Sequence, residues 1–90
     1  MNKVVEKKLV GRIAHYFSKI SVAVIELSAD LHVGDTIRIE GATTSFEQRV
    51  DSIEIENQKL EAATSGQAIG LKVKEKVRPN DSVYKVTRAE

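Results

Sequence analysis

Apolar and polar positions alternate with a period of two along most of the chain, a pattern typical of strands that are buried on one face. Turn-forming residues interrupt the alternation about every ten residues, so we expect six short strands, near residues 4–14, 20–28, 36–40, 46–55, 68–74 and 82–86. A single helical turn is expected at residues 60–63. Short antiparallel strands leave the fewest bare edges when their sheet closes on itself. The pattern therefore predicts an all-β fold, a single small closed antiparallel β-barrel of about six strands that spans residues 1–90 as one domain.

The first two predicted strands differ in how their apolar residues are placed. In the first strand, Leu9, Gly11 and Ile13 share one parity, and we expect them on one face. Residues 15–19 then interrupt this strand as a loop. The second strand is apolar on both faces except at Ser21 and Glu26, which is typical of a central strand covered on both sides.

The fourth predicted strand changes parity in its middle. Phe46 and Val50 share one parity, whereas Ile53 and Ile55 share the other. A shift of one residue moves every following side chain to the opposite face, so the strand needs one extra residue to keep both pairs inside. We therefore predict a β-bulge near residues 51–52, which would also bend the strand toward closure.

Two kinds of turn signal lie between the strands. Gly34 and Gly41 lie where the backbone is expected to need a positive φ, which glycine adopts without a steric penalty. The sequence Pro79-Asn80-Asp81 predicts a tight turn, because proline presets φ at the first central position and asparagine is tolerated at the next.

The residue types present exclude several kinds of functional site. The chain has no cysteine, so disulfides and thiolate metal sites are absent. His15 and His32 lie in separate predicted loops, and neither a Gly-rich phosphate loop nor a Gly-x-Ser-x-Gly nucleophile motif occurs. Glu54 and Glu56 share one strand face, which we interpret as solvated. We therefore expect no enzymatic activity, no cofactor and no bound metal.

Neither a membrane span nor a targeting segment is expected. The longest apolar stretch, residues 22–25, is far shorter than the roughly 20 residues that cross a bilayer. The N-terminal residues mix charges and lack the apolar core of a signal peptide, which favours a cytoplasmic location. Nine lysines and nine glutamates, beside three asparagines and three glutamines, are typical of thermophile proteins.

Charge is distributed unevenly along the chain, although the formal net charge is only +1. Residues 1–19 carry five basic and one acidic side chain, residues 20–71 carry three and nine, and residues 72–88 carry six and two. If the first and last strands are neighbours, their cations form one basic surface that attracts polyanions in a salt-dependent way. Aromatic side chains beside these cations are suited to stacking on bases. The candidate binding residues are Lys7, Lys8, His15, Tyr16, Phe17, Lys19, Lys72, Lys74, Lys76, Arg78, Lys85 and Arg88.

The same residues have a second, purely structural interpretation. Lysines on edge strands prevent aggregation between sheet edges, and loop aromatics often fold back onto the end of a barrel. In that case the lysines and aromatics would bind no polyanion.

Several segments resemble known families of β-barrels. The order and spacing seen in the second domain of translational GTPases, such as elongation factor Tu, recur in Val10-Gly11-Arg12-Ile13, residues 21–27, Leu31-x-Val33-Gly34-Asp35-x-Ile37-x-Ile39 and Ala63-x-x-Gly66-x-x-Ile69-Gly70-Leu71. Residues 10–17, 46–48 and 77–86 resemble more closely the stand-alone translation elongation factor-like proteins and the barrel appended to collagenase-type peptidases. The resemblance covers roughly residues 9–86 and implies a β-barrel. Of the elongation factor pocket that holds the aminoacyl end of transfer RNA, only Ile13 and Glu54 match.

Charge and resemblance together predict a non-enzymatic, translation-associated binding module that binds structured RNA, or a ribosome or translation-factor surface, through a basic face. The alternative is a protein-docking subunit that packs on a GTPase or peptidase partner and binds no nucleic acid. The chain has no GTPase domain, so nucleotide binding is not expected. An exposed apolar patch would favour the docking alternative.

Overall fold

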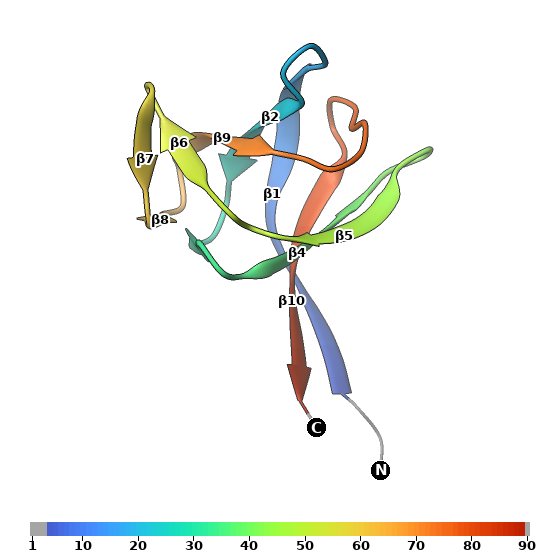
Figure 1. Cartoon of the computed structure of the whole chain (residues 1–90). Coiled ribbons are helices and arrows are strands. Elements are labelled where there is room, and N and C mark those ends of the chain that lie inside the picture. The colour runs from blue at the N-terminus through green and yellow to red at the C-terminus, as the bar shows by residue number, and fades with distance from the viewer. Residues whose placement is uncertain (1–3, 90) are drawn as a thin grey trace.

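The computed structural model describes the backbone of residues 4–89 and the side chains of residues 6–87, and it contains strands and turns but no helix in this part of the chain. Eight strands form one antiparallel sheet in the order β5-β4-β10-β1-β2-β9-β6-β7, and β3 pairs with β8 in a second, two-stranded sheet (Figure 1). The strands are β1 (Val4–Phe17), β2 (Val22–Leu27), β3 (Leu31–His32), β4 (Thr36–Glu40), β5 (Ser45–Arg49), β6 (Ile53–Ile55), β7 (Gln58–Leu60), β8 (Ala62–Ala63), β9 (Ala68–Lys72) and β10 (Ser82–Ala89). The helical turn predicted at residues 60–63 is wrong, because short strands occupy this stretch.

The all-β antiparallel fold is confirmed, whereas the closed barrel is wrong. β5 and β7 are the edges of the large sheet, and each has one hydrogen-bonded strand neighbour in the described part of the chain. A side chain of β5 links this edge strand to the end of β9 and the segment after it. Nε2 of Gln48 donates to the carbonyl oxygen of Lys72 at 2.9 Å, and Oε1 accepts from the amide of Lys74 at 2.8 Å. We call these two hydrogen bonds the seam.

The core is aliphatic, with Phe46 as its one buried aromatic side chain among the described residues. Alternate residues of most strands supply it, as the period of two predicts. The second strand departs from its prediction, because Val22 and Val24 on its other face are only half-buried rather than covered. The buried apolar cluster comprises Val10, Ile13, Ala23, Ile25, Leu27, Leu31, Ile37, Ile39, Phe46, Val50, Ile53, Ala63, Ile69, Leu71, Val73, Val77 and Val83.

Two register shifts bend β1, and neither is evident from the apolar pattern. Leu9 pairs with Tyr84 and Gly11 with Val83, so Val10 is the extra residue of the first shift. Val10 is therefore buried, while Leu9, predicted to share a face with Gly11 and Ile13, is 53% exposed on the other side. The second shift lies between Ile13 and His15. A bulge bends a strand without ending it. β1 therefore continues to Phe17, and the loop predicted at residues 15–19 is reduced to a turn after that residue.

The bulge predicted near residues 51–52 is replaced by a break in the strand. β5 ends at Arg49 and pairs with β4, whereas β6 begins at Ile53 and pairs with β7 and β9. Val50, in the break, is held by backbone hydrogen bonds to Asp35 and Gly34 of 2.8 Å each. The change of parity is therefore real, and it arises because the chain changes partners rather than because it inserts a residue.

The two ends of the described chain lie side by side, as the charge argument required. β1 and β10 pair from Val4 opposite Ala89 to Arg12 opposite Ser82. Their outer halves leave the body as a two-stranded ribbon, at the foot of Figure 1. We call this part, residues 4–8 with 85–89, the ribbon.

The turn predictions hold in part. Gly34 has a φ of 97°, and Asn80 has a φ of 74° between Pro79 and Asp81, so both turns form as predicted. Gly41 does not have a positive φ. It is needed instead for close approach, since a Cβ at this position would overlap Oδ1 of the buried Asp81.

A substitution at the first bend of β1 tests this packing. A Cβ on Gly11 would lie 2.6 Å from the carbonyl oxygen of Glu26 and 2.9 Å from Cγ2 of Ile25. We expect Gly11→Ala to lower the free energy of unfolding by about 1–3 kcal/mol, because backbone of the neighbouring strand must move. Gly70→Ala is the matched control, since its Cβ would meet neighbours no closer than 3.6 Å. Equal midpoints for the two variants in urea denaturation would contradict the described approach of β1 to β2.

Candidate functional site

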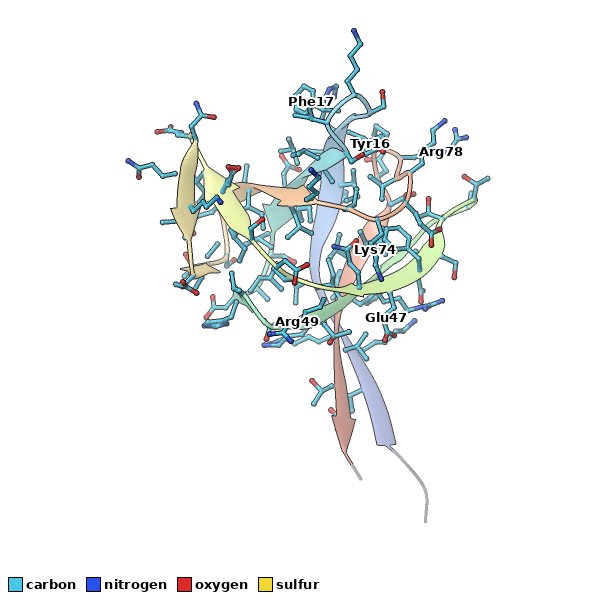
Figure 2. The ribbon with its side chains drawn as sticks, viewed as in Figure 1. Tyr16, Phe17, Glu47, Arg49, Lys74 and Arg78 are labelled. Carbon is cyan, nitrogen blue, oxygen red and sulfur yellow. The ribbon has the colours of Figure 1, made fainter. Side chains whose placement is uncertain are left out.

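The β1–β2 hairpin ends in an exposed apolar tip. Phe17 is 47% exposed and Ile20 is 59% exposed, whereas Tyr16 is half-buried and packs against the core. The rings of His15 and Phe17 meet edge to face with centroids 4.4 Å apart. Figure 2 shows Phe17 at the end of the molecule away from the ribbon. We call His15, Tyr16, Phe17, Lys19 and Ile20 the hairpin tip.

Local backbone contacts explain why these side chains point outward. The amide of Ile20 donates to the carbonyl oxygen of Phe17 at 3.3 Å, which closes the turn. Ser21 has a φ of 56°, so the chain reverses sharply before β2. Tyr16 anchors the hairpin on the core side, and its neighbour Phe17 therefore takes the opposite, solvent-facing side of the strand.

The segment between β9 and β10 rises beside the hairpin (Figure 1). The amide of Val73 donates to the carbonyl oxygen of Ser21 at 2.9 Å, and the amide of Asn80 donates to that of Ile13 at 2.8 Å. Val77 is 1% exposed, and its side chain packs the middle of the segment against the core. Lys76 and Arg78, on either side of Val77, are exposed. The segment thus carries two cations next to the hairpin tip.

Lys72 and Lys74 lie on a surface that also includes a cation absent from the predicted set. Together with Arg49, Asp51 and Ser52 they line an open hollow of about 430 Å³ over the seam. β9 ends at Lys72, so Lys74 and Lys76 belong to the connecting segment and not to one strand face. Arg49 is a β5 residue, and only the placement of β5 beside this segment brings it here.

The remaining predicted cations lie on or near the ribbon. Lys8 is directly opposite Lys85, and Nζ of Lys85 is 3.4 Å from Oδ2 of Asp35. Nζ of Lys7 is 3.0 Å from Oε2 of Glu40 and lies 4.6 Å from the centre of the Tyr84 ring. The side chain of Arg88 lies outside the described residues.

The structure therefore brings the candidate residues together in separate groups. Ten residues of β1 separate Lys7 from Phe17, which at a rise of about 3.3 Å per residue is roughly 30 Å. The hairpin tip and the neighbouring segment that carries Lys76 and Arg78 lie at one end, and the ribbon with Lys7, Lys8 and Lys85 lies at the other. Two of the ribbon cations, Lys7 and Lys85, already have carboxylate partners.

Among the described ionisable groups, Glu40 is the one whose pKa the fold clearly lowers. Nζ of Lys7 lies 3.1 Å from its Oε1, and Nε of Arg38 lies 2.5 Å from its Oε2. Hydrogen bonds from Lys7 and then from Arg38 hold the pKa of Glu40 below its usual range. This cluster joins β1 to β4 across the sheet and lies away from the hairpin tip.

One residue of the hairpin tip, Ile20, was not among the predicted binding residues. The apolar pattern assigns it to the start of the second strand, whereas the structure places it in the turn before that strand. The available signal was a large aliphatic residue between Lys19 and Ser21, at a position where polar turn residues are usual.

The described residues hold no group of three His, Asp or Glu side chains that could bind a metal. His15 lies at the hairpin tip and His32 in β3, so the two histidines do not form one site. No helix in the described part of the chain is long and apolar enough to cross a membrane.

Comparison with known proteins relates the chain to peptidases. No protein-family model matches it. A collagenase of Porphyromonas gingivalis is 46% identical over 87 residues, which covers 94% of this chain and 24% of the collagenase. An uncharacterized protease of Methanocaldococcus jannaschii is 43% identical over 76 residues, covering 83% of this chain and 19% of the protease. The chain thus spans a quarter or less of these relatives.

A solved structure has the same fold. The C-terminal domain of a Geobacillus thermoleovorans protein named as a U32 peptidase superposes with a TM-score of 0.82 at 23% identity, covering 87% of this chain and 91% of that domain. The comparisons do not show the resemblance to translation factors. Over almost its whole length the chain is homologous to a segment of collagenase-type proteases, and it has the fold of the C-terminal domain of a U32 peptidase.

Proposed function

We propose that the chain is a non-catalytic docking module that packs through its hairpin tip against the catalytic part of a U32-type peptidase. The observation that carries this proposal is the pair of exposed apolar side chains, Phe17 and Ile20, at 47% and 59% exposure. Large apolar side chains gathered at one exposed place are typical of protein interaction sites. The relatives support a peptidase as the partner, because in them the homologous segment belongs to a longer protease chain.

The chemistry of the hairpin tip favours a protein over RNA. Ile20, the most exposed of the large apolar side chains that the structure describes, is aliphatic and gains nothing from stacking on a base. Phe17 already makes an edge-to-face contact with His15. The ribbon cations Lys7 and Lys85 are engaged by Glu40 and Asp35, so they add less to a polyanion site than the sequence suggested.

A non-catalytic role is consistent with the described side chains. The carboxylate with a displaced pKa, Glu40, is held by two cations in its ionised form, which suits a structural ion pair better than proton transfer.

Site-specific photo-crosslinking tests the proposal. The photoreactive amino acid p-benzoylphenylalanine replaces Phe17 in the protein expressed in its source organism, and crosslinked peptides are identified by mass spectrometry. We expect the main adduct to be a catalytic segment of a U32-type peptidase, whether it belongs to the same polypeptide or to another. The same amino acid at Ala62, which is exposed in β8, is the control and should not capture that segment. Equal capture from both positions, or adducts that are RNA, would contradict the proposal.

A further inference from the structure

We infer that the surface which receives the hairpin tip is acidic around an apolar recess, so that the module docks on carboxylates as well as on apolar side chains. This inference rests on the proposed docking function and adds the chemistry of the partner. It follows from the cations that flank the exposed side chains of Phe17 and Ile20.

The cations at this end of the molecule outnumber the acids. Residues 13–21 and 75–80, which the hydrogen bond between Asn80 and Ile13 joins, carry three cations, Lys19, Lys76 and Arg78, and one exposed carboxylate, Glu75. The next carboxylate along the chain, Asp81, is 5% exposed and accepts the amide of Arg78 at 2.9 Å. It therefore presents no charge to a docking partner.

Three acids of the middle of the chain are paired with cations of other segments. Glu26 pairs with Arg12 at 3.0 Å on the face of the sheet, and Asp35 pairs with Lys85 at 3.4 Å. Glu40 pairs with Lys7 and Arg38. The molecule is nearly neutral, with a net charge of +1, yet its hairpin end is positive, so the field directs that end toward a negative surface.

The hairpin tip and the neighbouring segment resemble an interface that has an apolar centre and a charged rim. Phe17 and Ile20 are the exposed apolar side chains of the tip, and Lys19 lies between them in the chain. Lys76 and Arg78 are exposed on the neighbouring segment, which backbone hydrogen bonds hold beside the hairpin. Apolar contact at the centre provides most of the affinity, while charge at the rim selects the partner and speeds association. A basic partner would be repelled, and an acidic one attracted.

The cation-bearing segment is held in place before any partner binds. Val77 is buried between Lys76 and Arg78, and the Pro79-Asn80 turn closes with the amide of Asp81 donating to the carbonyl oxygen of Arg78 at 3.1 Å. Less conformational freedom is lost on binding when the backbone is already ordered. The rim is therefore suited to a defined set of carboxylates rather than to any diffuse negative charge.

Charge reversal in the crosslinking experiment tests the inference. With p-benzoylphenylalanine at Phe17, the triple variant Lys19→Glu/Lys76→Glu/Arg78→Glu should capture at least about 10-fold less of the peptidase segment than the unaltered charges do, because like charges at a rim slow association and weaken binding. Lys59→Glu, at an exposed position of β7 away from the tip, is the control and should leave the yield unchanged. The captured peptide should be rich in Asp and Glu.

Salt provides a second measurement that needs no charge variant. Raising NaCl from 50 to 500 mM should reduce capture by the unaltered charges several-fold, since rim charges are screened. Undiminished capture by the triple variant, together with a flat salt response, overturns the acidic partner while leaving docking intact. Failure of the Phe17 position to capture any peptidase segment overturns both the docking function and this inference. RNA adducts that disappear with salt overturn both in favour of RNA.

Discussion

Replacing Gln48 with leucine should lower the free energy of unfolding by about 2–4 kcal/mol, the largest stability effect that we expect from a single polar side chain of this protein. Gln48 is 8% exposed, and its amide group satisfies the carbonyl of Lys72 and the amide of Lys74. Leucine fills a similar volume but makes neither hydrogen bond. Stability is lost because the carbonyl of Lys72 and the amide of Lys74 would be left without hydrogen bonds where water has little access. Urea denaturation followed by circular dichroism measures it.

A matched glutamine separates this effect from a general cost of leucine in a strand. Gln58→Leu changes an exposed residue of β7 and should alter stability by less than about 0.5 kcal/mol. Gln48→Glu provides a second test, because a carboxylate can still accept from Lys74 but cannot donate to Lys72. We expect it to be destabilising at neutral pH. If Gln48→Leu is as stable as the unaltered protein, the side chain does not hold β5 to the segment after β9.

The double substitution Phe17→Ser/Ile20→Ser should weaken docking by about 10- to 100-fold while leaving the fold intact. The two side chains are the exposed centre of the hairpin tip, and a few central apolar residues usually provide most of the affinity of an interface. Because both are about half or more exposed in the free protein, their loss should cost less than about 1 kcal/mol of stability. Isothermal titration with the peptidase segment that Phe17 captures measures the affinity.

Leu9→Ser is the matched control for this double variant. Leu9 is 53% exposed, between Phe17 and Ile20 in exposure, but it lies eight residues before Phe17 on β1, roughly 25 Å away along the strand. It should not change the affinity. An equal loss from Leu9→Ser and from the double variant would mean that exposed apolar area in general, and not the hairpin tip, drives the association.

The candidate site could be predicted from the sequence only in its residue types. Phe17, Lys19, Lys76 and Arg78 can be identified because exposed residue types near turns are typical of binding sites, and the structure places the two segments that carry them side by side. Ile20 is missed, because an aliphatic residue beside Val22 matches a strand pattern as well as it matches a turn. The division of the cations between the hairpin end and the ribbon could not be predicted from the sequence either, because it depends on which strands pair and in which register.

The fold shows the same division between local and distant causes. The alternation of apolar residues identifies the antiparallel all-β class and most of the core, including Ile37, Ile39, Ile69 and Leu71, because side chains on a strand alternate faces whatever the strand pairs with. The Pro79-Asn80 turn is equally local, since it follows from the backbone preferences of two adjacent residues.

Strand partners and register are different, because they depend on contacts between residues far apart in the chain. The extra residue at Val10, the break at Val50 and the open seam at Gln48 each satisfy hydrogen bonds to segments 15 or more residues away. No run of neighbouring residues encodes such a choice, because the same apolar alternation fits a closed barrel and an open sheet equally well. The period of two in the chain thus sets the class and the buried face, and long-range pairing sets the edges, the bends and the exposed tip.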